Sequence, residues 1–151
     1  MSVAFFRERV ALLGLDPEIR EFDESTHTAA EAAAAIGCDV AAIVKSLVFE
    51  ADGAPLLILA SGPNRVDTDA VGARLGVVIG KADAKQVKRV TGYSIGGVPP
   101  LGLREPIRTV IDATLLRLPL LWAAAGSATA VFPIEPADLV RLTGGQVIPV
   151  A

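Results

Sequence analysis

Lys45 is the residue whose type and position in this chain most directly suggest chemistry. It stands in the apolar run Ile43-Val44-Lys45-Ser46-Leu47-Val48-Phe49, which has the composition of a β-strand. Because side chains of a strand alternate between its faces, Lys45 shares a side with Ile43 and Leu47, where an ammonium group requires a polar or anionic partner. A lysine head group can hold a phosphate or polarise a carbonyl as a point charge. The alternative is a lysine at a sheet rim whose stem packs while its amine reaches water.

The loop from Thr91 to Gly102 is the second candidate, because it contains four glycines and two adjacent prolines. A plain connection between a helix and a strand needs fewer of both, since glycine serves there for positive φ and proline for fixed turns. Glycines also let a ligand approach the backbone, and prolines hold main-chain amides in place, as a substrate-orienting or oxyanion-stabilising element requires. The spacing matches neither the dinucleotide-binding GxGxxG pattern nor a P-loop. We expect Lys45 to face this loop across a shared cavity.

The other residues that could act as bases, nucleophiles or metal ligands are few. His27 lies at the entry of a predicted helix, a position more typical of an exposed histidine than of a catalytic one. Ser46, Ser94 and Ser127 would all need His27 for a serine triad, and none lies in a nucleophile-elbow pattern. Cys38 follows a helix end and is expected to be a small buried residue. With one cysteine and one histidine the chain cannot supply a structural zinc site. A site made of carboxylates alone stays open, but no pattern in the sequence supports it, and no metal is expected.

The charge of the chain limits how it could bind nucleic acid. A net charge of -3 over 151 residues argues against binding by bulk attraction, which depends on clustered basic residues. Any contact must therefore be local. Lys81, Lys85 and Lys88 fall on one side of a predicted helix, with Arg89 adjacent, and could form a small RNA footprint. A solvated helix face would explain the same pattern.

The length and the terminal segments predict one domain over residues 1–151 in the cytoplasm. The N-terminus lacks the features of a secretory signal. An uncharged run covers residues 118–134, at the short end of the roughly 17 to 25 residues that cross a bilayer. Because it contains Pro119, Gly126 and Pro133, it is better interpreted as two buried strands around a turn, and no membrane contact is expected.

Hydrophobic periodicity and turn residues predict helices and strands in alternation. The helices expected cover residues 3–13, 29–36, 67–75, 83–90 and 136–143, and the strands 20–22, 42–50, 55–61, 77–79, 108–111, 120–124 and 129–134. Asp52-Gly53 indicates a hairpin, which requires antiparallel pairing. We therefore expect an α/β fold of the α+β-like kind, with a mixed, barrel-like sheet that is surrounded by helices.

Taken together, these motifs resemble the YbaK/EbsC family, which includes free-standing prolyl-tRNA editing proteins and the editing domain of bacterial prolyl-tRNA synthetases. The resemblance covers nearly the whole chain and rests on segments 28–33, 44–49, 91–102 and 110–112. It implies hydrolysis of the ester that links a wrong amino acid to tRNA-Pro, without metal, cofactor or catalytic triad. Lys45 matches a required lysine that engages the terminal nucleotide and substrate, and Gly96 and Pro100 match the ends of a GxxxP loop that orients the aminoacyl group. Ser46, Gly97, Val98 and Pro99, which lie next to these positions, are expected to bind the substrate as well.

The resemblance also bears on the amino acid that is removed. An approximate alignment puts Phe22, Ala124 and Val131 where cysteine-clearing members have polar groups. An apolar pocket favours a small aliphatic side chain, so alanine or 2-aminobutyrate is expected rather than cysteine. The expected partner is the acceptor end of tRNA-Pro; whether a prolyl-tRNA synthetase also takes part, and the oligomeric state, stay open. The alternatives are a non-catalytic module that binds the acceptor end and, more distantly, a small-molecule esterase.

Overall fold

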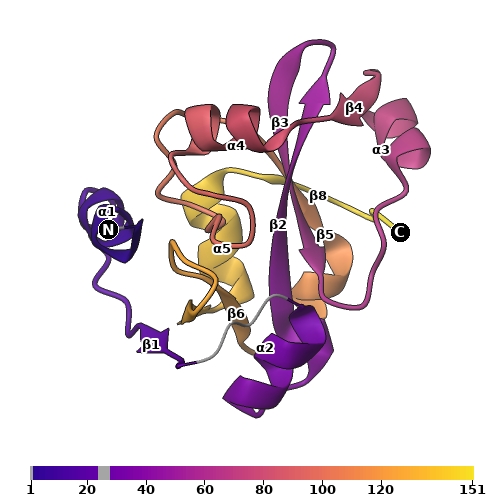
Figure 1. Cartoon of the computed structure of the whole chain (residues 1–151). Helices are drawn as coiled ribbons and strands as arrows, with labels where there is room; N and C mark the ends of the chain where they lie inside the picture. Colours follow the sequence, from indigo (N-terminus) through magenta and orange to yellow (C-terminus); the bar gives the residue numbers. More distant parts are fainter. Residues whose placement is uncertain (1, 24–27) are drawn as a thin grey trace.

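The computed structural model describes residues 2–23 and 28–151 (Figure 1). Its α-helices are α1 (Ser2–Ala11), α2 (Ala29–Ile36), α3 (Thr68–Leu75), α4 (Ala84–Thr91) and α5 (Pro136–Thr143). Its strands are β1 (Arg20–Glu21), β2 (Ile43–Ala51), β3 (Ala54–Ser61), β4 (Ile79–Lys81), β5 (Arg108–Asp112), β6 (Leu121–Ala124), β7 (Ala130–Ile134) and β8 (Gln146–Ile148). Short 3-10 helices η1 (Val40–Ala42) and η2 (Ala113–Arg117) complete the described elements.

The eight strands form one mixed sheet in the order β1-β7-β6-β2-β3-β5-β8, with β4 joined to β2 outside this path. The long β2–β3 hairpin is antiparallel, and its turn places Asp52 and Gly53 at φ 51° and 86°, as a two-residue hairpin turn requires. β3 then pairs with β5, and β5 with β8, in parallel. The predicted mixed sheet with surrounding helices is confirmed; over the described residues the strand path is open, ending at β1 and β8.

Both faces of the β2–β3 hairpin are covered, as the apolar pattern predicts. Leu57 and Leu59 of β3 belong to a cluster that includes residues of α1, α4 and α5. The alternate residues Leu56 and Ile58 belong to a second cluster with Val71 of α3. Figure 1 shows the corresponding arrangement, with α1, α4 and α5 to one side of the hairpin and α3 to the other. This packing fixes both β2 and the connections that leave it.

Strand β2 changes its neighbour along its length. On the edge away from β3, its first residues Ile43 and Val44 pair with β6, whereas its last residues, from Phe49 to Ala51, pair with β4. Among the described residues no strand pairs with that edge between Lys45 and Val48. The sheet is therefore split beside the lysine singled out above.

Side chains cap the starts of several helices. Thr28 is the N-cap of α2, and its hydroxyl accepts a hydrogen bond from the Glu31 amide at 3.0 Å. The Glu31 carboxylate in turn accepts a hydrogen bond from the Thr28 hydroxyl, and not from the Thr28 amide as in a capping box. Asp67 and Asp83 cap α3 and α4 in the same manner.

Several sequence-based boundaries are wrong. The strand predicted at 77–79 lies at Ile79–Lys81, because the chain first leaves α3 through a bond from the Val77 amide to the Gly72 carbonyl. Lys81 therefore belongs to β4 and not to the following helix. The short strand β8 was not predicted. No helix among the described residues is both long and apolar enough to span a membrane.

Candidate functional site

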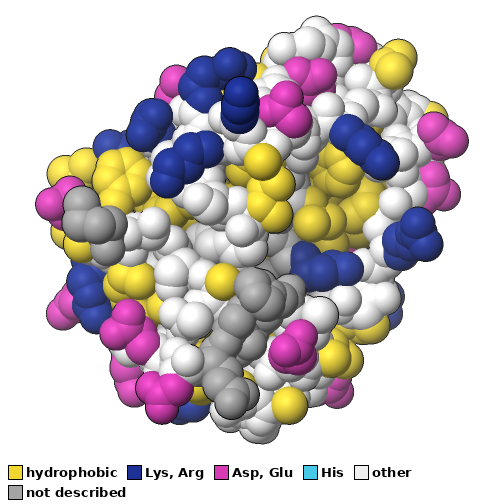
Figure 2. Space-filling view, viewed as in Figure 1, with side chains coloured by type: hydrophobic (Ala, Val, Ile, Leu, Met, Phe, Trp, Pro, Cys, Tyr) yellow, Lys and Arg dark blue, Asp and Glu magenta, His cyan; other side chains and the backbone are white. Residues whose placement is uncertain are grey.

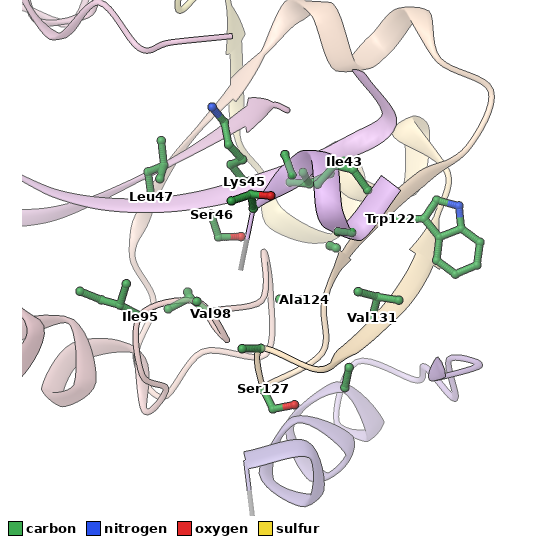
Figure 3. A pocket seen from close by; sticks show the side chains of 18 residues that line it. Ile43, Lys45, Ser46, Leu47, Ile95, Val98, Trp122, Ala124, Ser127 and Val131 are labelled. Atoms are coloured by element: carbon green, nitrogen blue, oxygen red, sulfur yellow. The ribbon is translucent and has the colours of Figure 1, made fainter. Parts of the chain in front are cut away.

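A cavity of about 250 Å³ opens where β2 loses its partner strand (Figure 3). Its walls come from the start of α2, from β2, β6 and β7, and from the loop after α4. The cavity is at the small end for ligand pockets, which suits an amino-acid-sized group. It is lined by Thr28, Ala29, Ala32, Ile43, Val44, Lys45, Ser46, Leu47, Ile95, Gly96, Val98, Trp122, Ala123, Ala124, Ser127, Ala128, Ala130 and Val131.

Lys45 is half-buried and its amine is held in place. Nζ donates a hydrogen bond to the main-chain oxygen of Asn64 at 2.5 Å. Burial lowers the pKa of Lys45 below its ordinary value of 10.5, and the charge of Asp112 acts in the opposite direction. The apolar strand therefore carries a cation with a specific polar partner, as the sequence requires, and not an amine that is free in water.

Lys45 and Ser46 leave β2 in opposite directions, as Figure 3 shows. Ser46 is on the side of Val98 and Ala124, whereas the Lys45 amine points away from them. The expectation that the amine faces the Thr91–Gly102 loop is therefore wrong, although both border one cavity. The reason is the alternation of the strand, which directs the next residue to the loop.

Ser46 brings unused hydrogen-bonding groups to the cavity. Its hydroxyl oxygen is buried and has no hydrogen-bond partner in the described structure. Such a group is uncommon in a folded protein, and this one borders a cavity in which a ligand could supply its partner. The other hydroxyls of the lining have partners: Thr28 bonds Glu31, and Ser127 accepts from the Thr129 amide at 3.3 Å.

The main chain of Ser46 also points toward the split in the sheet. The two-residue turn makes Ala51 and Ala54 a hydrogen-bonded pair, and such pairs alternate along an antiparallel ladder. Ser46 and Leu59 are consequently a non-hydrogen-bonded pair, so the N–H and C=O groups of Ser46 are directed away from β3. They face the edge that no described strand covers, where a ligand with main-chain-like groups could pair with them.

The loop from Thr91 to Gly102 is fixed at both ends. The Tyr93 hydroxyl donates to the Gly102 carbonyl at 2.7 Å, and the Tyr93 amide donates to the Thr91 hydroxyl at 3.0 Å. Tyr93 is fully buried against Phe5, with ring centroids 5.3 Å apart. Within the loop, the Gly97 amide bonds the Ser94 carbonyl, while Ile95 at the rim is 63 % exposed. The loop thus presents a rigid backbone and one exposed apolar side chain.

The remaining walls of the cavity are apolar. Ala124 and Val131 face each other across the β6–β7 pair, whose register joins them directly. Trp122 is 8 % exposed and belongs to the same cluster as Val131. Arg20 lies over the Trp122 ring at 4.7 Å from its centroid, which brings a cation to the outer side of this wall.

Six of the ten residues predicted from sequence line the cavity: Lys45, Ser46, Gly96, Val98, Ala124 and Val131. The other four are not among the lining residues. Gly97, Pro99 and Pro100 are buried residues of the loop itself, and Phe22 packs in the cluster that contains Val131. Their predicted roles in substrate binding remain proposals.

Sequence reasoning missed Trp122, Ile95 and Asn64 as parts of this site. Trp122 had a signal, because it is the single tryptophan and falls on a predicted strand. Asn64 had none, since its contribution to Lys45 is a main-chain oxygen that any residue type would supply. Cys38 is partly buried, which together with Asp39 raises the pKa of its thiol and disfavours a nucleophilic thiolate. His27 lies outside the described residues.

The described residues hold no group of three or more histidine, cysteine, aspartate or glutamate side chains suited to a metal ion. Lys85, Lys88 and Arg89 are exposed on α4, and Lys81 is exposed on β4. Figure 2 shows Lys and Arg side chains gathered over the part of this face where Figure 1 places α4.

The model of the aminoacyl-tRNA editing domain matches residues 23–142, which include every residue that lines the cavity. The chain belongs to the aminoacyl-tRNA editing domain family. This agrees with the resemblance to YbaK-like proteins inferred from the sequence.

Individual relatives of this editing domain are consistent with that assignment. The uncharacterized protein YwhH of Bacillus subtilis is 28% identical over 148 residues, which is 97% of this chain and 94% of that protein. The proline–tRNA ligase of Bacillus licheniformis is 33% identical over 133 residues, covering 85% of this chain but 23% of the ligase. A crystal structure described as that of a candidate trans-editing enzyme for prolyl tRNA synthetase superposes with TM-score 0.94 and 38% identity, covering 99% of this chain and 96% of that one.

The close approach of Gly97 to the β6–β7 turn generates a prediction for this editing domain. A Cβ at Gly97 would lie 2.8 Å from Ser127 Cα, a backbone atom that cannot rotate away. We expect Gly97→Ala to lower the free energy of unfolding by about 1 to 3 kcal/mol, as overpacking does. The matched control is Gly80→Ala, whose Cβ would meet nothing within 4 Å and should change stability by no more than about 0.5 kcal/mol. Urea titration measures both; equal midpoints would contradict the tight packing.

Proposed function

We propose that this editing domain acts in trans on mischarged tRNA-Pro and hydrolyses the aminoacyl ester of a small amino acid, alanine or 2-aminobutyrate in preference to cysteine. The observation that carries the proposal is a small apolar cavity at which Lys45, the unpartnered Ser46 hydroxyl and a rigid glycine-rich loop meet. The likeness to a candidate trans-editing enzyme for prolyl tRNA synthetase supports the tRNA-Pro assignment.

Because Lys45 and Ser46 point in opposite directions, we assign them to different parts of the substrate. Lys45 binds the phosphate or ribose of the terminal nucleotide, because its amine lies on the side of β2 away from the apolar walls. The aminoacyl group enters between β2 and the loop, where the main chain of Ser46 can bond its α-amino and carbonyl groups. The side chain of the aminoacyl group then contacts Ala124 and Val131.

Hydrolysis in this cavity depends on orientation more than on a protein base. The described lining contains no histidine and no carboxylate, so the attacking water is activated by main-chain groups and by the ribose hydroxyl of the substrate, as the family resemblance implies. Water adds to the ester carbonyl, the bond to the ribose oxygen breaks, and that oxygen takes a proton. The main-chain amides of Gly96 and Val98 are the groups we assign to stabilise the developing oxyanion, because the Gly97 amide bonds Ser94 and prolines have no N–H.

Removal of the Lys45 amine tests the anchor. We expect Lys45→Ala to reduce single-turnover deacylation of alanyl-tRNA-Pro by at least about 10-fold, the decrease that follows when transition-state binding weakens by about 1.4 kcal/mol. Arg141→Ala is the matched control, because it removes one exposed positive charge on α5, outside the cavity. A folded Lys45→Ala protein with wild-type rates would refute the anchor. Retained tRNA affinity without hydrolysis in the wild type would instead favour a non-catalytic binding module.

The small size and the apolar lining of the cavity predict how substrates are ranked. We expect alanyl- and 2-aminobutyryl-tRNA-Pro to be hydrolysed faster than cysteinyl-tRNA-Pro. Ala124→Val narrows the apolar wall and should reduce hydrolysis of the 2-aminobutyryl ester more than that of the alanyl ester. The ratio of the two rates should change roughly 10-fold, since one methylene is worth about 1 to 3 kcal/mol in such a pocket. Equal decreases for both esters would mean that Ala124 does not touch the side chain.

The exposed basic residues predict a dependence on salt. Deacylation should weaken as salt rises, because phosphates bound by Lys85 and Lys88 release counterions. The double variant Lys85→Ala/Lys88→Ala should reduce the slope of log kcat/KM against log salt by roughly 0.7 to 0.9 for each phosphate that is no longer neutralised. Arg74→Ala/Arg141→Ala removes the same charge from α3 and α5 and should leave the slope unchanged. A wild-type rate that does not vary with salt would exclude the basic footprint.

A further inference from the structure

The Lys45 amine is oriented by a residue far away in the sequence. Nζ donates to the Asn64 carbonyl in the connection between β3 and α3. A lysine ammonium has three N–H donors, so this bond leaves two for a ligand. Its flexible four-carbon stem would otherwise sample many rotamers, and holding it in one lowers the entropic cost of binding.

Asn64 is itself held by its side chain. The amide nitrogen Nδ2 donates to Asp112 Oδ2 at 2.8 Å and to Thr114 Oγ1 at 3.1 Å. Both hydrogens of the amide are thereby used, and both partners lie at the end of β5 and the start of η2. The position of the carbonyl that receives Lys45 is therefore set by hydrogen bonds on the other side of β3.

Asp112 is the buried end of this chain of hydrogen bonds. It is 1% exposed, and its carboxylate accepts three hydrogen bonds: from the Ser61 amide at 3.0 Å, the Thr114 amide at 3.0 Å and Asn64 Nδ2. The two bonds from main-chain amides join β3, β5 and η2, which is a structural role. The bond to Asn64 joins no strand. It holds the segment whose main-chain carbonyl accepts the hydrogen bond from Lys45.

We propose that Asn64 and Asp112 are positioning residues that orient the Lys45 amine for the terminal nucleotide of the substrate. The inference rests on the function proposed above for Lys45. Asp112 is too deeply buried to touch a ligand and acts through Asn64. Its negative charge also favours the protonated amine and offsets part of the effect of burial.

The decisive variant is Asn64→Ala, which keeps the main-chain carbonyl and removes its anchor. We expect deacylation of alanyl-tRNA-Pro to fall by about 10- to 100-fold, as misplacement of a binding group does. The matched control is Thr109→Val. Thr109 lies on β5, as Asp112 does, and the variant removes its side-chain hydrogen bond to the Ile107 carbonyl; the rate should stay at the wild-type value. Asn64→Ala at the wild-type rate would overturn the proposal.

A second readout does not depend on activity. The lysines of the chain are Lys45, Lys81, Lys85 and Lys88, so 13C-labelled lysine gives few NMR signals, and Lys45→Ala identifies the one from Lys45. Asn64→Ala should remove the chemical-shift difference between the two ε-protons of Lys45, which reports a fixed amine. Asp112→Asn should move the titration midpoint of Lys45 further below 10.5, because a favourable charge is removed. A purely structural role would leave both unchanged in folded variants and would overturn the proposal.

The rate measurement and the NMR measurement together distinguish a failure of this inference from a failure of the function on which it rests. If the wild type does not hydrolyse any of the esters, the proposed function fails, while the NMR signals still decide whether Asn64 holds the amine. If the wild type is active and Asn64→Ala changes the Lys45 signals but not the rate, the amine is held without consequence for the reaction, and the positioning role is refuted.

Discussion

The site depends on the way strand β2 is shared between two neighbours. β6 pairs with its beginning and β4 with its end, and the stretch between them keeps one edge without a strand partner among the described residues. A strand edge has directional donors and acceptors that must bond to something. Here that edge forms a wall of the cavity, next to a buried hydroxyl without a partner. The gap in the sheet is thus the reason for a polar strip inside an otherwise apolar pocket.

Two separate supports keep this strip rigid. On one side, the loop after α4 is closed on itself by the bond from Tyr93 to Gly102 and anchored in the main core. On the other, the lysine is held by the connection after β3, which is tied to the buried Asp112. Both supports originate outside the cavity, in elements that belong to the packed body of the domain. Preorganisation of this kind means that little conformational freedom is given up when a ligand binds.

The extent to which sequence predicts this structure follows the range of the interactions. The helix at residues 29–36 and the Asp52-Gly53 turn depend on residues close in sequence, and both predictions were confirmed. The strand near Val77 was misplaced and β8 was missed, because pairing partners rather than local propensity define such short strands. Lys45 was recognised because its type conflicts with its surroundings. Its direction could not be predicted, because the loop's position relative to the strand's two faces depends on tertiary packing.

The close packing of Gly97 on Ser127 couples two walls that are distant in the sequence. Because the backbone of one rests directly on the backbone of the other, neither can move toward the other while its neighbour stays in place. A side chain at position 97 therefore requires the β6–β7 turn to shift as well. Direct contact between the two main chains thus sets the distance between these walls, and that distance can decrease only if both segments change together.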